Sequence, residues 1–207
     1  MSTRAMIFDF DGTIADTFMT VIGILNALSG EYGYRPATPD ELPALMAFTP
    51  RQLAERMGLS WHQLPVIALR VRTEMTRNMA SIAPFQGVPA ALDALRERGV
   101  RVGMLTSNNR ENVERFLAVH PELRFDFVST GSGLFGKHHR LKRLLSREKI
   151  LPREACYVGD EVRDIEAART VGMRMIAVTW GFSAPQLLAA SKPEHLIADP
   201  AELVGLV

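Results

Sequence analysis

The chain has 207 residues, 47% of them hydrophobic, so it can bury a sizeable core as one domain or as one domain with an insert. Its 24 basic and 23 acidic residues leave a net charge of +1, which argues against nucleic acid or an anionic membrane as a partner. The sequence contains no stretch as long as a membrane span and no signal peptide, so we expect a cytoplasmic protein.

A short apolar run, Ala5–Phe8, is predicted to form the first strand, and two carboxylates follow it at Asp9 and Asp11. Positions i and i+2 point the same way where a strand leaves a buried sheet, and Gly12 permits the turn that follows. Two acids in one pocket repel each other unless a cation, a shared proton or a division of labour resolves the repulsion. A nucleophile and a general acid beside Mg2+ form one such division. The other interpretation is an Asp-Gly turn that closes a buried strand.

About ninety residues separate this run from the next one, far more than a single crossover helix needs. Within residues 14–83 the apolar positions recur at helical spacing, and starts such as Thr38-Pro39-Asp40-Glu41 resemble helix caps. We predict that residues 14–83 form an all-helical cap and that residues 1–13 and 84–207 form the core. A cap above a strand end would exclude water and shape specificity. Within it, Arg51 could reach a substrate carboxylate or second phosphate, or could be ordinary surface.

Later apolar runs alternate with helical segments, which predicts an α/β fold with a parallel sheet and helices on both faces. The predicted strands cover residues 100–105, 125–128, 155–158 and 175–178. Ligands of such sheets bind beyond the carboxyl ends of the strands. Asp9, Thr106 and Asp160 each follow an apolar run, so we expect them to converge on one rim.

Thr106, Ser107 and Asn108 stand between the second predicted strand and a helix. A hydroxyl and the backbone N–H groups of a helix N-terminus can bind an anion there. The alternative is that Asn108 caps the helix, with Glu111 completing the capping box, and both interpretations can hold together.

Lys137 follows the glycine-rich stretch 131–136 and is the first lysine in the chain. A compact ammonium group suits a transferring phosphoryl group with a carboxylate beside it, whereas a surface lysine is the alternative. Lys137 also opens a basic segment that runs to Lys149. We interpret this segment as a solvated helix face, because leucines at helical spacing supply a buried stripe, and we expect no nucleic-acid partner.

Asp160 and Asp164 follow the fourth predicted strand and lie one helical turn apart, so both can face one spot. Mg2+ prefers such hard oxygen ligands and keeps several waters. The alternative is that Asp160 and Glu161 are only favourable charges in the first turn of a helix.

In chain order, these motifs resemble those of the haloacid dehalogenase superfamily, closest to its phosphoglycolate phosphatase-like hydrolases with a helical cap. The motifs are Asp9-Phe10-Asp11-Gly12-Thr13, Thr106, Lys137, and Gly159-Asp160 through Asp164. The resemblance implies a Rossmann-like three-layer core with strand order 5-4-1-2-3. It also implies a Mg2+-dependent phosphatase that hydrolyses a small phosphorylated metabolite.

The resemblance assigns a role to each motif residue. Asp9 is implied to be the nucleophile that becomes an aspartyl phosphate, and Asp11 the general acid and base. Thr106 and Ser107 would hold the phosphoryl oxygens, and Lys137 would neutralise the nucleophile and the phosphate.

The same resemblance implies the metal ligands. Asp9, the carbonyl of Asp11, and Asp160 would bind Mg2+, and Asp164 would orient Lys137 or a metal-bound water. Asp11 also favours phosphatase or mutase chemistry over dehalogenation. A sugar-phosphate mutase and a non-catalytic ligand-sensing relative stay open as alternatives.

Two features depart from the family pattern. Lys137 is followed by His138-His139-Arg140-Leu141 instead of Lys-Pro-x-Pro, which leaves Lys142 as a second candidate for the active-site lysine. The cap lacks a glycine-rich specificity loop near residues 46–51, which leaves the physiological substrate open.

Overall fold

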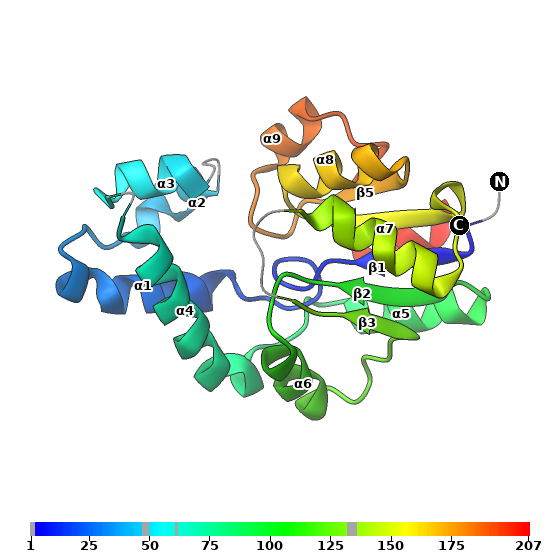
Figure 1. The fold of residues 1–207 in the computed structure, drawn as a ribbon, viewed down its shortest axis with the longest axis horizontal. Helices are drawn as coiled ribbons and strands as arrows, with labels where there is room; N and C mark the ends of the chain where they lie inside the picture. Colours follow the sequence, from blue (N-terminus) through cyan, green and yellow to red (C-terminus); the bar gives the residue numbers. More distant parts are fainter. Residues whose placement is uncertain (1–2, 47–49, 61, 132–135) are drawn as a thin grey trace.

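The protein is described by a computed structural model that covers residues 3–46, 50–60, 62–131 and 136–207. Its centre is a parallel sheet with helices on both faces, and further helices gather at one end of it (Figure 1). Within the described residues the sheet has six strands, in the order β3-β2-β1-β4-β5-β6. They are β1 (Ala5–Phe8), β2 (Arg101–Leu105), β3 (Phe127–Ser129), β4 (Ala155–Gly159), β5 (Arg174–Val178) and β6 (His195–Ile197).

The predicted α/β class with a parallel sheet is confirmed. Read from the other edge, the order is β6-β5-β4-β1-β2-β3, which is the predicted 5-4-1-2-3 order with a sixth strand added. β6 was not predicted, because three residues at a sheet edge are too short to show a periodic pattern.

The register of the central strands brings their carboxyl ends to one level. β1 pairs in parallel with β2 on one side and β4 on the other, and Phe8 aligns with Met104 and Val158. The segments that follow these strands therefore leave the sheet at one rim.

Two apolar layers cover the two faces of the sheet. Met6 and Phe8 point into one layer, and Ala5 and Ile7 point into the other, as strand alternation requires. The first layer is completed by α5 (Val88–Glu97), α6 (Arg110–Val119) and the 3-10 helix η4 (Pro200–Leu206). The second is completed by α7 (Lys137–Glu148), α8 (Val162–Val171) and α9 (Pro185–Ala190). A short 3-10 helix, η3 (Pro152–Glu154), leads into β4.

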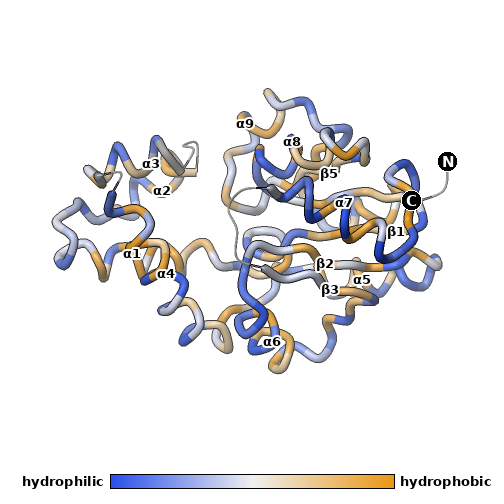
Figure 2. Tube along the Cα trace, in the orientation of Figure 1, coloured by the Kyte–Doolittle hydropathy of each residue, from blue (hydrophilic) through white to orange (hydrophobic). Residues whose placement is uncertain are grey.

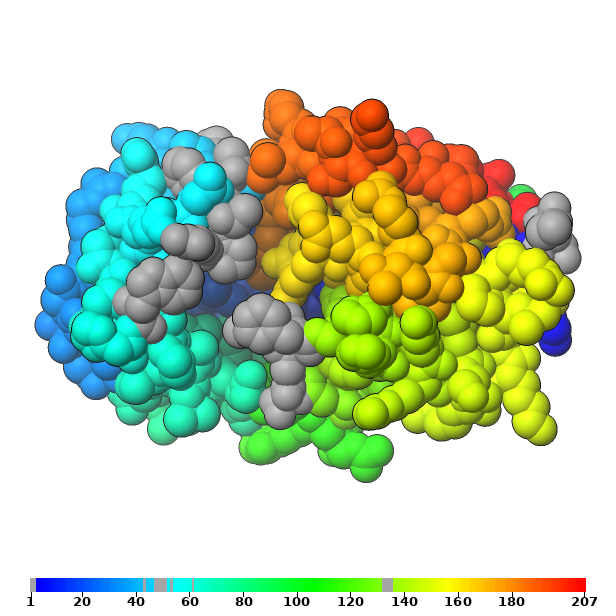
Figure 3. All heavy atoms as spheres, turned by 45° about the horizontal axis from the view of Figure 1, so that its top comes forward, coloured from blue at the N-terminus to red at the C-terminus, as the bar shows by residue number. Residues whose placement is uncertain are grey.

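Between β1 and α5 the described residues form helices, which we call the cap helices. They are α1 (Phe18–Tyr32), η1 (Pro39–Glu41), α2 (Leu42–Leu45), α3 (Pro50–Arg56), α4 (Leu64–Asn78) and η2 (Met79–Ser81). Apolar residues recur along α1 and α4 as well as along the strands (Figure 2). Figure 3 shows the surface hollowed between the cyan cap helices and the yellow and orange core helices. No helix of the described ranges is long and apolar enough to cross a membrane.

The two connections between the cap helices and the sheet run side by side. Asp16 N donates to Ala83 O at 3.0 Å, and Phe85 N donates to Ile14 O at 2.9 Å. The predicted boundaries after residues 13 and 83 fall within this paired segment, and the division into cap and core stays a prediction.

Candidate active site

Three buried carboxylates, two from strand ends and one from the first turn of α8, gather at the rim of the sheet. Asp9, Asp160 and Asp164 each place a carboxylate oxygen within 4.8 Å of the others. Lys137 is 8% exposed, and its Nζ donates to Asp9 Oδ2 at 2.6 Å and also to Asp164. The cluster thus joins residues that lie up to 155 positions apart in the chain.

The carboxylate of Asp160 is held by the loops that follow β1 and β5. Thr13 Oγ1 donates to Asp160 Oδ1 at 2.7 Å, and Phe182 N donates to Oδ2 at 2.8 Å. Gly12 has φ of +76°, and a Cβ there would lie 2.2 Å from Asp160 Oδ2. The glycine of the first motif therefore supplies a left-handed turn and also leaves room for Asp160.

Lys137 and Asp164 come from the first turns of two helices that pack together, α7 and α8. Asp164 Oδ2 accepts a hydrogen bond from Glu161 N at 3.1 Å, which fixes the carboxylate that also meets Lys137. Lys142, the second candidate from the sequence, is exposed on α7. The structure therefore brings Lys137, and not Lys142, to the cluster.

The cluster carries more negative than positive charge. Burial raises the pKa of Asp160 well above its usual value, and the charges of Glu161, Asp164 and Asp9 raise it further. Burial alone would lower the pKa of Lys137, but Asp164 and Asp9 together hold it well above its usual value. Because hard carboxylate oxygens with excess negative charge are what Mg2+ prefers, these residues fit a divalent cation.

Asp11 stands apart from the cluster and contacts Asn108. Asn108 Nδ2 donates to both carboxylate oxygens of Asp11, at 3.2 and 3.1 Å. Burial raises the pKa of Asp11 to about 6, and the charge of Asp9 adds to the shift. A carboxyl group whose pKa approaches neutrality can both give and accept a proton near pH 7.

The interpretation of Asn108 as the helix cap is wrong. Asn109 caps α6, and its side chain accepts a hydrogen bond from Asn112 N at 2.7 Å. Asn108 lies one residue before the cap, which frees its side-chain amide to reach Asp11. Its backbone N–H donates to Thr106 Oγ1 at 2.9 Å, so it also orders the hydroxyl at the end of β2.

A hydrogen-bond chain continues from Asn108 into the cap helices. Asn112 is fully buried, and its Nδ2 donates to Asn108 Oδ1 at 2.8 Å. Thr76, on α4, donates to Asn112 Oδ1 at 2.6 Å. Neither Asn112 nor Thr76 was predicted, since the only signal in the sequence was the four-residue spacing of Asn108 and Asn112.

Thr106 and Ser107 occupy the segment after β2. Thr106 is buried, and Ser107 is half-buried and lines a cavity that Asp11 also lines. Arg140 donates to Thr106 O at 2.6 Å and to Gly131 O at 3.2 Å. The predicted solvated face of α7 is therefore wrong for Arg140, which ties together the loops after β2 and β3. The other predicted feature of that helix, its stripe of buried leucines, is present.

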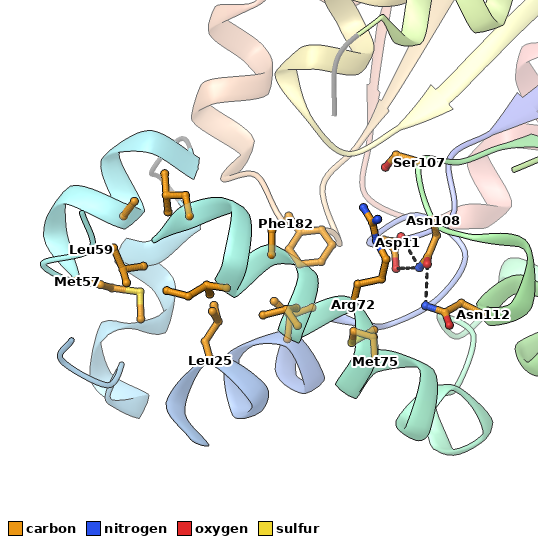
Figure 4. Close-up of a pocket in the computed structure, with 16 residues that line it drawn as sticks. Asp11, Leu25, Met57, Leu59, Arg72, Met75, Ser107, Asn108, Asn112 and Phe182 are labelled. Carbon is orange, nitrogen blue, oxygen red and sulfur yellow. Dashed lines mark hydrogen bonds between the residues drawn. The ribbon is translucent and has the colours of Figure 1, made fainter. Parts of the chain in front are cut away.

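A cavity of about 340 Å³ lies between the cap helices and the rim of the sheet (Figure 4). The core contributes polar groups at one end, namely Asp11, Ser107, Asn108 and Asn112. The rest of the wall is mostly apolar and comes largely from the cap helices, with Val21, Leu25, Ala54, Met57, Leu59, Leu64, Ile67, Ala68, Val71 and Met75. The predicted cap contact Arg51 belongs to α3, but its side chain lies outside the described residues.

Comparison with known proteins matches one family over most of the chain. The model of haloacid dehalogenase-like hydrolases matches residues 6–178. A phosphoglycolate phosphatase from Synechococcus elongatus is 39% identical over 206 residues, which cover 99% of this chain and 97% of that protein. An N-acetylmuramic acid 6-phosphate phosphatase from Pseudomonas aeruginosa is 25% identical over 221 residues, which cover 100% of this chain and 96% of that protein.

Solved structures share the fold. The crystal structure of a candidate phosphoglycolate phosphatase from Lactobacillus plantarum covers 100% of both chains with a TM-score of 0.84 at 19% identity. At that identity the likeness concerns the fold alone.

Proposed function

The chain belongs to the haloacid dehalogenase-like hydrolases and is a phosphatase of that family, and on this premise we propose a Mg2+-dependent phosphomonoester hydrolase with a covalent intermediate on Asp9. The observation that carries the proposal is the position of Asp9 in the buried cluster, in contact with Lys137 and within 4.8 Å of two further carboxylates. A carboxylate nucleophile and an ammonium group supply the positioning and charge neutralisation that phosphoryl transfer needs.

In the proposed first step, an Asp9 oxygen forms a bond to phosphorus as the bond to the ester oxygen breaks. Asp11 gives its proton to the departing alkoxide, and the raised pKa of its carboxyl group suits that role. Lys137 neutralises charge on Asp9 and on the transferring group, while Thr106 and Ser107 hold phosphoryl oxygens.

In the proposed second step, water attacks the phosphorus and the aspartyl bond breaks. Asp11 now takes a proton from the water, and Asp9 is regenerated as phosphate leaves. Asp164 keeps Lys137 in place throughout.

The carboxylates of Asp9 and Asp160, with the carbonyl of Asp11, would hold Mg2+. When bound, Mg2+ would supply charge neutralisation for the nucleophile and the phosphoryl oxygens. Residues 14–83 would act as a cap that excludes bulk water from the reaction.

We propose a small phosphorylated metabolite as the substrate, and phosphoglycolate is the first compound to test because of the relative at 39% identity. The two relatives named above are described by different substrates, phosphoglycolate and N-acetylmuramic acid 6-phosphate. Both compounds carry a carboxylate as well as a phosphate ester.

The test measures phosphate release from a panel of phosphorylated metabolites and from 4-nitrophenyl phosphate, with and without Mg2+. Asp9→Asn is expected to lose turnover on every substrate while it folds normally. Asp16→Asn, at an exposed position between β1 and α1, serves as the control. Substantial turnover by folded Asp9→Asn would exclude the proposed covalent intermediate on Asp9. Product analysis separates a hydrolase, which releases free phosphate, from a mutase, which releases an isomerised sugar phosphate.

A further inference from the structure

A cation lies on the apolar wall of the cavity. The residues of α4 that line the cavity recur at helical spacing, and apart from Arg72 they are apolar: Leu64, Ile67, Ala68, Val71 and Met75. Arg72 lies on the same face and is half-buried. An apolar side chain at this position would pack without the desolvation cost of a charged group, so the placement of Arg72 needs another explanation.

The neighbouring arginines of α4 have acidic partners, whereas Arg72 has none among the described residues. Arg70 pairs with Glu31 at 3.4 Å, and Arg77 pairs with Glu74 at 2.7 Å. Within the described ranges, no side chain forms a hydrogen bond or ion pair with the guanidinium of Arg72. Its donors are therefore available to a molecule in the cavity.

The guanidinium extends toward the catalytic end of the cavity. Figure 4 shows it reaching from α4 toward Asp11 and Ser107, while Met57 and Leu59 lie at the opposite end. Asp11 itself is engaged by Asn108. Since the departing oxygen of the substrate would lie beside Asp11, the guanidinium faces the part of the leaving group that adjoins this oxygen.

We propose that Arg72 is a specificity residue that binds a second anionic group of the substrate, a carboxylate or a second phosphate, close to the scissile ester. The planar guanidinium donates two parallel hydrogen bonds to either anion. The substrate class is then a small phosphomonoester with two anionic ends separated by a short linker. This inference rests on the proposed function and adds the recognition of the leaving group to it.

The experiment compares the catalytic efficiency, kcat/KM, for four compounds: phosphoglycolate, ethylene glycol bisphosphate, glycerol phosphate and 4-nitrophenyl phosphate. Arg72→Met keeps an unbranched side chain, shorter than that of arginine, and removes the charge and the hydrogen-bond donors. It is expected to lower the efficiency for the doubly anionic esters roughly 10- to 100-fold, mostly through KM, as the loss of a hydrogen bond to a charged group predicts. For the two esters without a second anion the change is expected to stay within about threefold.

Two further variants separate recognition from folding. Arg72→Lys retains the charge and is expected to recover part of the lost affinity, and Arg77→Met, five residues along the same helix, is expected to match the wild type. An equal loss on all four compounds, or no loss on any, would overturn the role of Arg72. The larger of the two losses caused by Arg72→Met, that for phosphoglycolate or that for the bisphosphate, shows which anion Arg72 prefers.

The wild type distinguishes this inference from the proposed function. If the wild type hydrolyses 4-nitrophenyl phosphate but neither doubly anionic ester, the proposed hydrolase function stands and the proposed role of Arg72 is wrong. Absence of Mg2+-dependent phosphate release from all four compounds would count against the proposed function itself.

Discussion

The ammonium nitrogen of Lys137 lies 2.6 Å from Oδ2 of Asp9, and both side chains are buried. The same nitrogen donates to Asp164, so one cation contacts two carboxylates, and a third carboxylate, that of Asp160, lies close to both. A lysine suits this position, because a compact ammonium fits between a carboxylate that follows β1 and another on α8, where a planar guanidinium would need more space.

Lys137→Met is expected to lower the catalytic efficiency toward 4-nitrophenyl phosphate on the order of 100- to 1000-fold, because it removes a preorganised positive charge beside Asp9, the proposed nucleophile. It should also lower the free energy of unfolding in the absence of metal by roughly 3 kcal/mol, since Asp9 and Asp164 lose their counter-ion. Lys142→Met, at an exposed position of the same helix, is the control. If Lys142→Met were the inactive variant, the assignment of the active-site lysine would be wrong.

Asp11→Asn is expected to separate the two chemical steps. The 4-nitrophenolate ion leaves without a proton, so formation of the aspartyl phosphate survives, whereas attack by water lacks its base. Rapid mixing should show a burst of about one nitrophenolate per enzyme, followed by slow steady turnover. Glycerol phosphate, whose alkoxide needs the proton, should show no burst, and a burst of equal size with both substrates would contradict the role of Asp11.

Removal of divalent metal is expected to abolish turnover and to lower thermal stability. A cation that binds only the folded state at about 100 times its Kd adds about 2.7 kcal/mol to the free energy of unfolding. Asp160→Asn should lose this Mg2+-dependent shift, whereas Glu166→Gln, an exposed acid on α8, should keep it. Thermal unfolding of each variant with Mg2+ and with a chelator measures this shift. An undiminished Mg2+-dependent shift in Asp160→Asn would exclude that residue as a ligand.

Local patterns predicted the strands and the motif positions well, because each depends on a few consecutive residues. The run Ala5–Phe8 is β1 as predicted, and the residues after β1, β2 and β4 meet because parallel strands end at one rim. Proximity of Asp9 and Asp160 follows from that topology alone.

The groups that no sequence pattern predicted depend on how separate elements pack. Whether Asn108 or Asn109 caps α6 depends on where the helix begins, and a shift of one residue redirects a side chain to Asp11. Thr76 and Arg72 reach the site only because α4 presents one face to the core. Helical spacing identifies the members of a face but not the direction that the face points.

Gly12→Ala is expected to inactivate the protein for a reason beyond backbone strain. Gly12 and Gly99 have nearly the same φ, +76° and +78°, but an added Cβ would meet Asp160 at the first position and open space at the second. Gly99→Ala should therefore lose about 1–2 kcal/mol of stability and keep its activity. Gly12→Ala should also lose turnover and the stabilisation by Mg2+, as measured by the same assays, and an active Gly12→Ala would show that Asp160 can move without consequence.

The hydrogen-bond chain from Thr76 on α4 to Asp11 is expected to influence catalysis. Its donors all point the same way: Thr76 to Asn112, Asn112 to Asn108, and Asn108 to the carboxylate of Asp11. Such aligned bonds polarise one another, so the loss of the first donor weakens the hold on Asp11.

Thr76→Val keeps the shape of the side chain and removes the first donor of this chain. We expect kcat to fall about three- to tenfold with KM nearly unchanged, and Thr76→Ser, which restores the hydroxyl, to recover kcat. Thr73→Val is the matched control, because the hydroxyls of Thr73 and Thr76 both lie within hydrogen-bond distance of the backbone carbonyl four residues earlier, but Thr73 is exposed and Thr76 alone reaches Asn112. Any effect of removing a helix-surface hydroxyl is then common to both variants, and only the difference between them reports the link to Asp11. Equal kcat values for Thr76→Val and Thr73→Val would show that α4 and Asp11 act independently.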